Sequence, residues 1–100
     1  MRYNNFLHLL QYLKTALSFS YPVKVKRANI RNKHDSDCQL KNNTFLIRIQ
    51  RSLTEPQAID ALLHEIAHCL AWNKEDDLHG QKWGEAYSIV YKKFLEWSED

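Results

Sequence analysis

The sequence predicts a single α+β domain over residues 1–100, because helical and strand-like hydrophobic patterns follow one another along one short chain. Apolar residues recur at helical spacing near the N-terminus and throughout the second half. Between these stretches, apolar and polar residues alternate. One hundred residues can form one hydrophobic core and are too few for two. We therefore expect a helix, a small three-stranded sheet and two further helices, in that order.

The N-terminal part predicts a helix followed by a strand. Five apolar residues share one helical face: Phe6, Leu9, Leu10, Leu13 and Leu17. Residues 4–18 are therefore expected to form an amphipathic helix. It should end before Tyr21-Pro22, because proline disfavours helical geometry in the residue before it. Residues 23–26 then alternate valine with lysine, as in a strand with one solvated face.

The middle of the chain predicts a β-hairpin. Apolar residues occupy every second position of 44–50, which is the clearest strand pattern in the sequence. Asn42-Asn43 precedes it, and asparagine tolerates left-handed turn geometry, so residues 37–41 are expected to pair with 44–50. The polar stretch 29–37 is expected to be a loop. If the 44–50 strand is an exposed edge, it could hold an extended peptide by strand addition.

The second half predicts two helices. Thr54 and Gln57 have the spacing of a capping box, and Pro56 suits a first helical turn. A broad apolar surface follows, which predicts a largely buried helix: Ile59, Leu62, Leu63, Ile66, Ala67 and Leu70. This helix should end near Trp72-Asn73. The last helix should begin around Gly80 and turn one face inward: Trp83, Ala86, Tyr87, Val90, Tyr91, Phe94 and Leu95.

Charge is distributed unevenly along the chain, although the net charge is only +2. Residues 1–53 hold ten Lys and Arg against two Asp, a net charge of +8. Residues 54–100 hold four Lys against ten Asp and Glu, a net charge of −6. Two interpretations fit this asymmetry: the two halves attract each other across one fold, or the basic half binds nucleic acid or an acidic substrate. The sequence leaves both interpretations open.

The sequence predicts a cytoplasmic protein without a membrane span. The apolar stretch 6–14 is interrupted by His8, Gln11 and Lys14, and no small-residue cleavage site follows it, so it does not read as a signal peptide. No stretch approaches the roughly 20 apolar residues that a membrane span needs. Two cysteines, Cys38 and Cys69, are too few for a disulfide framework and are expected to be reduced.

The motif with the clearest chemistry is His64-Glu65-Ile66-Ala67-His68, which matches the H-E-x-x-H pattern within the predicted buried helix. Residues four apart are neighbours on a helix, so both imidazoles can bind the same metal ion. Glu65 is offset from His64 by about 100° around the helix. It can therefore reach a water on the metal without being a ligand itself. These residue types at this spacing predict Zn²⁺ with Glu65 as the catalytic general base.

A catalytic zinc site needs a third protein ligand and keeps the fourth position open for water. His79 is the preferred candidate, because a third imidazole suits zinc and Gly80 lets the backbone turn back over the helix. Downstream carboxylates compete with it: Glu75, Asp76, Asp77 and Glu85. Cys69 follows His68 but points about 100° away around the helix, so it is expected to lie in the core.

This motif, followed by His79-Gly80-Gln81-Lys82-Trp83, resembles the SprT-like (Spartan-type) family of zinc metalloproteases. The resemblance is specific over residues 44–83. It implies a zincin-like fold, with His64, His68 and His79 as zinc ligands and Glu65 as general base. It also implies that Trp83 packs the helix of the third ligand against the core, and that DNA-associated proteins are substrates. Many members carry a cysteine-rich zinc module, whereas no cysteine follows Cys69 in these residues.

The predicted activity is hydrolysis of peptide bonds in a protein or peptide substrate, with a Tyr or Arg as a further donor to the oxyanion: Tyr87, Tyr91 or Arg48.

One alternative is a metal-dependent ribonuclease. A small bacterial endoribonuclease family uses three histidines near a basic surface, but it spaces the third much closer and does not require glutamate after the first. The other alternative is a non-catalytic module with a closed, four-coordinate zinc, whose fourth ligand would be His34, Cys38 or Asp77. Cleavage preference and oligomeric state are left open.

Overall fold

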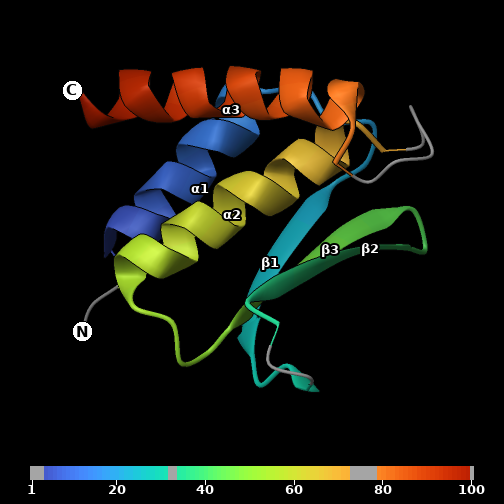
Figure 1. Cartoon of the computed structure of the whole chain (residues 1–100), viewed down its shortest axis with the longest axis vertical. Coiled ribbons are helices and arrows are strands. Elements are labelled where there is room, and N and C mark those ends of the chain that lie inside the picture. The colour runs from blue at the N-terminus through green and yellow to red at the C-terminus, as the bar shows by residue number, and fades with distance from the viewer. Residues whose placement is uncertain (1–3, 32–33, 73–78, 100) are drawn as a thin grey trace.

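The computed structural model describes residues 4–31, 34–72 and 79–99. Within these residues, three helices and three strands occur in the predicted order (Figure 1). Their bounds are α1 Asn4–Ala16, β1 Val23–Ala28, β2 Ser36–Lys41, β3 Thr44–Gln50, α2 Glu55–Leu70 and α3 Gln81–Ser98. The α+β class and the three-stranded sheet are confirmed.

The three strands pair in the order β1-β3-β2. β1 runs parallel to β3, with Val23 opposite Phe45, and β2 runs antiparallel to β3, with Ser36 opposite Ile49. Residues 44–50 therefore form the central strand, and the condition set for strand addition there, an exposed edge, is not met. Backbone groups of β3 are paired on both sides, so this strand cannot accept a further peptide, and the two edges are β1 and β2.

The β2–β3 hairpin is closed by Asn42 and Asn43, with φ angles of 52° and 58°. Both asparagines adopt the left-handed geometry that a two-residue hairpin turn requires, so the predicted hairpin is confirmed. β2 nevertheless begins at Ser36, inside the stretch 29–37 that was expected to be a loop. Pairing extends this far because the backbone N–H of Gln50 donates to the carbonyl of Asp35 over 2.7 Å.

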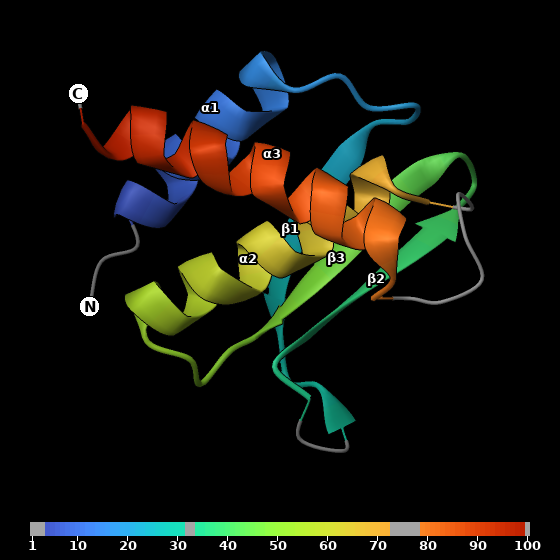
Figure 2. The same ribbon diagram turned by 45° about the horizontal axis from the view of Figure 1, so that its top comes forward.

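All three helices lie on one side of the sheet (Figures 1 and 2). β3 alternates between buried and half-buried side chains along its length, and Phe45, Ile47 and Ile49 are the fully buried ones. α2 packs on β2 and β3, while α1 and α3 pack on α2 and on each other. The buried side chains of these elements form a hydrophobic core that runs from α1 through α2 to the sheet. α2 is thus covered by sheet on one side and by helices on the other.

The buried position of α2 agrees with its sequence. The side chain of Thr54 accepts from the backbone N–H of Gln57, and the Gln57 side chain accepts from the backbone N–H of Thr54, so the predicted capping box is present. The helix ends at Leu70, slightly before the predicted end, and Trp72 packs edge-on against Phe45. In the part of the chain that the structure describes, no helix is both long and apolar enough to cross a membrane.

Candidate metal centre

α2 places His64 and His68 side by side. Their Nε2 atoms lie 3.1 Å apart, and both side chains are half-buried. The residues between and beside them on the helix, such as Leu63 and Ile66, are fully buried in the core. Core packing therefore fixes the helix while its i, i+4 spacing brings the two rings together. This arrangement follows from the local sequence alone.

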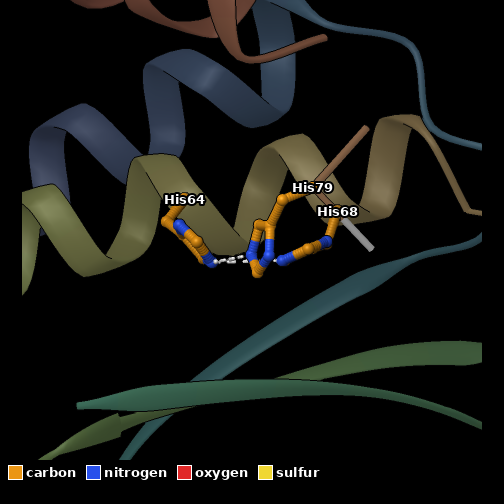
Figure 3. A group of neighbouring side chains, drawn as sticks. All are labelled: His64, His68 and His79. Atoms are coloured by element: carbon orange, nitrogen blue, oxygen red, sulfur yellow. Dashed lines mark hydrogen bonds between the residues drawn. The ribbon is translucent and has the colours of Figure 1, made fainter. Parts of the chain in front are cut away.

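His79 joins this pair from a distant part of the chain. It lies just before α3, and its Nε2 atom is 3.2 Å from that of His64. The three rings point toward one another (Figure 3). One nitrogen of each ring lies within 4.8 Å of the other two. The three imidazoles are therefore close enough to bind one metal ion.

Two of the three nitrogen–nitrogen distances suit a shared metal ion. In a tetrahedral zinc site, with zinc–nitrogen distances of about 2.0–2.1 Å, neighbouring nitrogens lie about 3.3 Å apart. The distances of 3.1 and 3.2 Å are close to this value, and the third pair lies within 4.8 Å. Burial, followed by the proximity of His64 and His79, lowers the pKa of His68 to about 4. Burial and His79 likewise lower the pKa of His64. The neutral imidazole, which is the form that binds a metal, is thereby favoured.

The Trp83 ring contacts the rings of all three histidines. Its indole N–H donates to the backbone carbonyl of His64 over 3.3 Å. Its ring centroid is 5.0 Å from those of His64 and His79 and 5.7 Å from that of His68. Trp83 is half-buried and packs against the hydrophobic core. It therefore holds the start of α3 against α2, as the resemblance implied.

Glu65 is the one buried charged side chain among the described residues, with 4% of its surface exposed. The Ser36 hydroxyl donates to Glu65 Oε2 over 2.6 Å. Burial raises the pKa of Glu65, and Asp37 adds to the rise, while the Ser36 hydrogen bond and His79 oppose it. Glu65 and His64 line the same open cleft of about 390 Å³. The other residues lining this cleft are His34, Asp35, Ser36, Gln57, Asp60 and Ala61.

Ser36 was missed in the sequence because residues 29–37 were expected to be a loop. The available signal was the alternation of Ser36, Cys38 and Leu40, which share one face if the strand starts early. Gln50 also helps to shape this side of the cleft. Its side chain accepts from the backbone N–H of Ile30 and donates to the carbonyl of His34, which fixes the approach to β2.

The other candidate ligands that the structure describes are not part of the three-histidine group. Glu85 accepts from the Gln81 side chain on α3 and is not part of the group. His34 lines the cleft, and Cys38 contacts Cys69, but neither joins the three nitrogens. The remaining candidates, Glu75, Asp76 and Asp77, lie outside the described residues. Within the described part of the chain, the group therefore consists of three imidazoles.

The three candidate oxyanion donors differ in position. Arg48 is excluded, because its guanidinium binds both carboxylate oxygens of Asp37 on the face of the sheet opposite Ile47 and Ile49. Tyr87 stacks on Trp83 with ring centroids 5.1 Å apart. Tyr91 stacks on Tyr87 one step further away and is 42% exposed. Tyr87 is therefore the closer of the two tyrosines to the metal centre along this row of rings.

Comparison with known proteins returns no match to this chain among protein-family models, curated proteins or solved structures. The SprT-like resemblance therefore stays a prediction from the motif residues.

Proposed function

We propose that this protein is a zinc-dependent metallopeptidase of SprT-like type that hydrolyses peptide bonds. One observation carries the proposal: three imidazole nitrogens converge beside a cleft that also contains the buried carboxylate of Glu65. Neutral nitrogen ligands in a set of three suit zinc in a catalytic site. DNA-associated proteins are a proposed substrate class on the resemblance alone.

Zinc, when bound, would lower the pKa of a coordinated water to about 7 and polarise the peptide carbonyl. Glu65 supplies the proton transfers. Its carboxylate accepts a proton from the attacking water and returns it to the leaving amine nitrogen. Burial supports this double role, because a raised carboxyl pKa lies closer to the working pH and eases both transfers.

Two further residues assist this chemistry in the proposal. Ser36 donates to one carboxylate oxygen, Oε2, and leaves the other free to face the water. Tyr87 is the proposed oxyanion donor in place of Arg48. Burial, Asp60 and Tyr91 raise the pKa of its hydroxyl, so the hydroxyl keeps its proton and can donate a hydrogen bond.

The substrate would bind along β2 and not along β3. β2 is an edge strand, and it begins at Ser36, which lines the cleft. An extended peptide can add to such an edge through backbone hydrogen bonds. This arrangement would carry the scissile bond across the cleft between Glu65 and His64.

The site favours this proposal over the ribonuclease alternative. A ribonuclease of the three-histidine type does not require a buried carboxylate next to the first histidine, whereas Glu65 is buried and hydrogen-bonded there. A structural zinc site normally has four protein ligands, so the non-catalytic alternative is decided by the hydrolysis test below.

A cleavage assay with a matched pair of variants tests the proposal. Glu65→Gln keeps the size of the side chain and removes its basicity, and Glu85→Gln makes the same change on the surface of α3. We expect zinc-loaded wild type and Glu85→Gln to cleave an unstructured protein substrate, with or without DNA. Glu65→Gln should retain zinc and lose about 10³-fold or more in rate.

Undiminished proteolysis by Glu65→Gln would contradict the proposal. RNA cleavage that survives this substitution, without proteolysis by wild type, would indicate the ribonuclease. Zinc binding without hydrolysis of either substrate would indicate the non-catalytic module.

A further inference from the structure

Two cysteines meet between β2 and α2, next to the metal centre. The Sγ atoms of Cys38 and Cys69 lie 3.4 Å apart, although the residues are separated by 31 positions in the sequence. Both are free thiols. Cys69 is buried and follows His68 directly, whereas Cys38 is half-buried on the edge strand. The proposed peptidase chemistry uses neither sulfur.

The packing of two regular elements fixes this contact. Ser36 and Cys38 are two apart on β2 and share the face toward α2, and Glu65 and Cys69 are four apart on α2 and share the face toward β2. Two residues of a strand span about 6.6 Å and four residues of a helix about 6 Å, so the two pairs match. The Ser36–Glu65 hydrogen bond and the Cys38–Cys69 contact are therefore successive links between the same two elements.

We propose that Cys38 and Cys69 are an oxidative modification site at which hydrogen peroxide forms a reversible disulfide between β2 and α2. The bond lies beside the carboxylate and histidines of α2 and stabilises the packing that positions them. Its formation does not depend on the proposed peptidase function.

The reaction balances with peroxide as the only oxidant. The sulfur of Cys38, the more accessible thiol, attacks one peroxide oxygen and breaks the O–O bond, which gives a sulfenic acid and one water. The sulfur of Cys69 then attacks the Cys38 sulfur and expels its hydroxyl group as a second water. The two thiols lose two electrons and two protons, and the peroxide is reduced to water.

The geometry needs only a small adjustment. A disulfide has sulfurs about 2.05 Å apart, so the two Sγ atoms must approach by about 1.4 Å. The closed loop would include the hairpin, the linker to α2 and most of α2. A cross-link over a loop of this length restricts the unfolded chain strongly, which stabilises the folded protein.

The test compares reduced and peroxide-treated full-length protein by intact mass, free-thiol content and thermal unfolding. Wild type should lose the mass of two hydrogen atoms and both free thiols while staying a single chain. Its Tm should rise by about 10 °C, and dithiothreitol should reverse the rise. Cys38→Ser and Cys69→Ser should show no peroxide-dependent rise in Tm.

Three results would overturn the proposal. They are a gain in mass from oxygen atoms added to the cysteines separately, disulfide-linked dimers, and an intramolecular disulfide that lowers the Tm. The wild-type comparison remains informative even if a serine variant fails to fold. Glu65→Gln should form the same disulfide as wild type, so a failure of the proposed peptidase function is distinguishable from a failure of this inference.

Discussion

The helix α2 holds two of the three histidines of the candidate metal centre, and α3 begins just after the third, but the two helices are held in the fold in different ways. Eight of the sixteen residues of α2 are buried, whereas only Ala86 and Val90 are buried among the eighteen of α3. α2 is therefore part of the core, and α3 is a surface helix. α3 packs instead through half-buried and exposed aromatic rings, of which Trp83, Tyr87 and Tyr91 stack in sequence.

This difference divides the site into two parts. α2 supplies His64, Glu65 and His68 from a helix that the core holds in place. His79 lies just before α3, at the end of the helix where the indole N–H of Trp83 donates to the backbone carbonyl of His64. Two of the candidate ligands are thus brought together by local spacing, and the third is brought to them by tertiary packing. The comparison predicts different consequences for changes in the two parts.

Removal of a metal ligand should have the largest effect. Loss of a residue that only supports a metal ligand typically weakens metal binding by about 10–100-fold. His68→Ala and His79→Ala each remove a proposed ligand itself and should weaken zinc binding by more than this. His8→Ala, on the exposed face of α1, is the control and should bind zinc like wild type. Competition with a chromophoric chelator measures all three. If His79→Ala bound zinc as tightly as wild type, His79 would not be a ligand.

The difference in burial between α2 and α3 should appear in the free energy of unfolding. Ile66 on α2 is fully buried, whereas Ile89 on α3 is 52% exposed, so the same substitution can be made at both. Ile66→Ala should lower the free energy of unfolding by about 2–5 kcal/mol, because it leaves a cavity in the core. Ile89→Ala should change it by about 0.5 kcal/mol or less. Urea unfolding of the metal-free proteins gives both values, and equal losses would show that α3 belongs to the core as much as α2 does.

The smallest predicted effect concerns the contact between β2 and α2. The Ser36 hydrogen bond stabilises ionised Glu65 and lowers its pKa, so Ser36→Ala should raise that pKa further. In the proposed mechanism Glu65 must be ionised to act as the base, so the acid limb of the pH dependence of kcat/KM should move to higher pH. A hydrogen bond to a charged group contributes about 1.5 kcal/mol, so the rate on that limb should fall about 10-fold.

Ser88→Ala, a change on the exposed side of α3, provides the control for this experiment. An acid limb that stays in place in Ser36→Ala would mean that Ser36 does not act on the base.

Much of the fold could be predicted because its signals are local. The N-terminal helix, the asparagine turn at 42–43 and the Thr54–Gln57 capping box each depend on residues a few positions apart. The proximity of the two histidines of α2 could be predicted for the same reason, since it is determined by their i, i+4 spacing. The N-terminal helix was predicted over 4–18 and ends two residues earlier, at Ala16. His79 was preferred among the candidate third ligands on chemistry, and the structure places it beside the pair.

The remainder depends on strand pairing, which local patterns do not encode. The parallel pairing of β1 with β3 places β3 in the centre of the sheet, and no periodicity within either strand predicts that order. The pairing of Arg48 with Asp37 depends on the register of β2 against β3. The same register brings Ser36 next to Glu65. The exclusion of Arg48 as an oxyanion donor and the unpredicted contact of Ser36 with Glu65 therefore have the same physical cause.

X-ray absorption spectroscopy of the zinc-loaded protein tests the central claim most directly, because it reports the ligands of the bound metal. Convergence of His64, His68 and His79 predicts three imidazole nitrogens at about 2.0–2.1 Å and one further light-atom ligand. A spectrum with two imidazoles, or with sulfur at about 2.3 Å from Cys38 or Cys69, would contradict it.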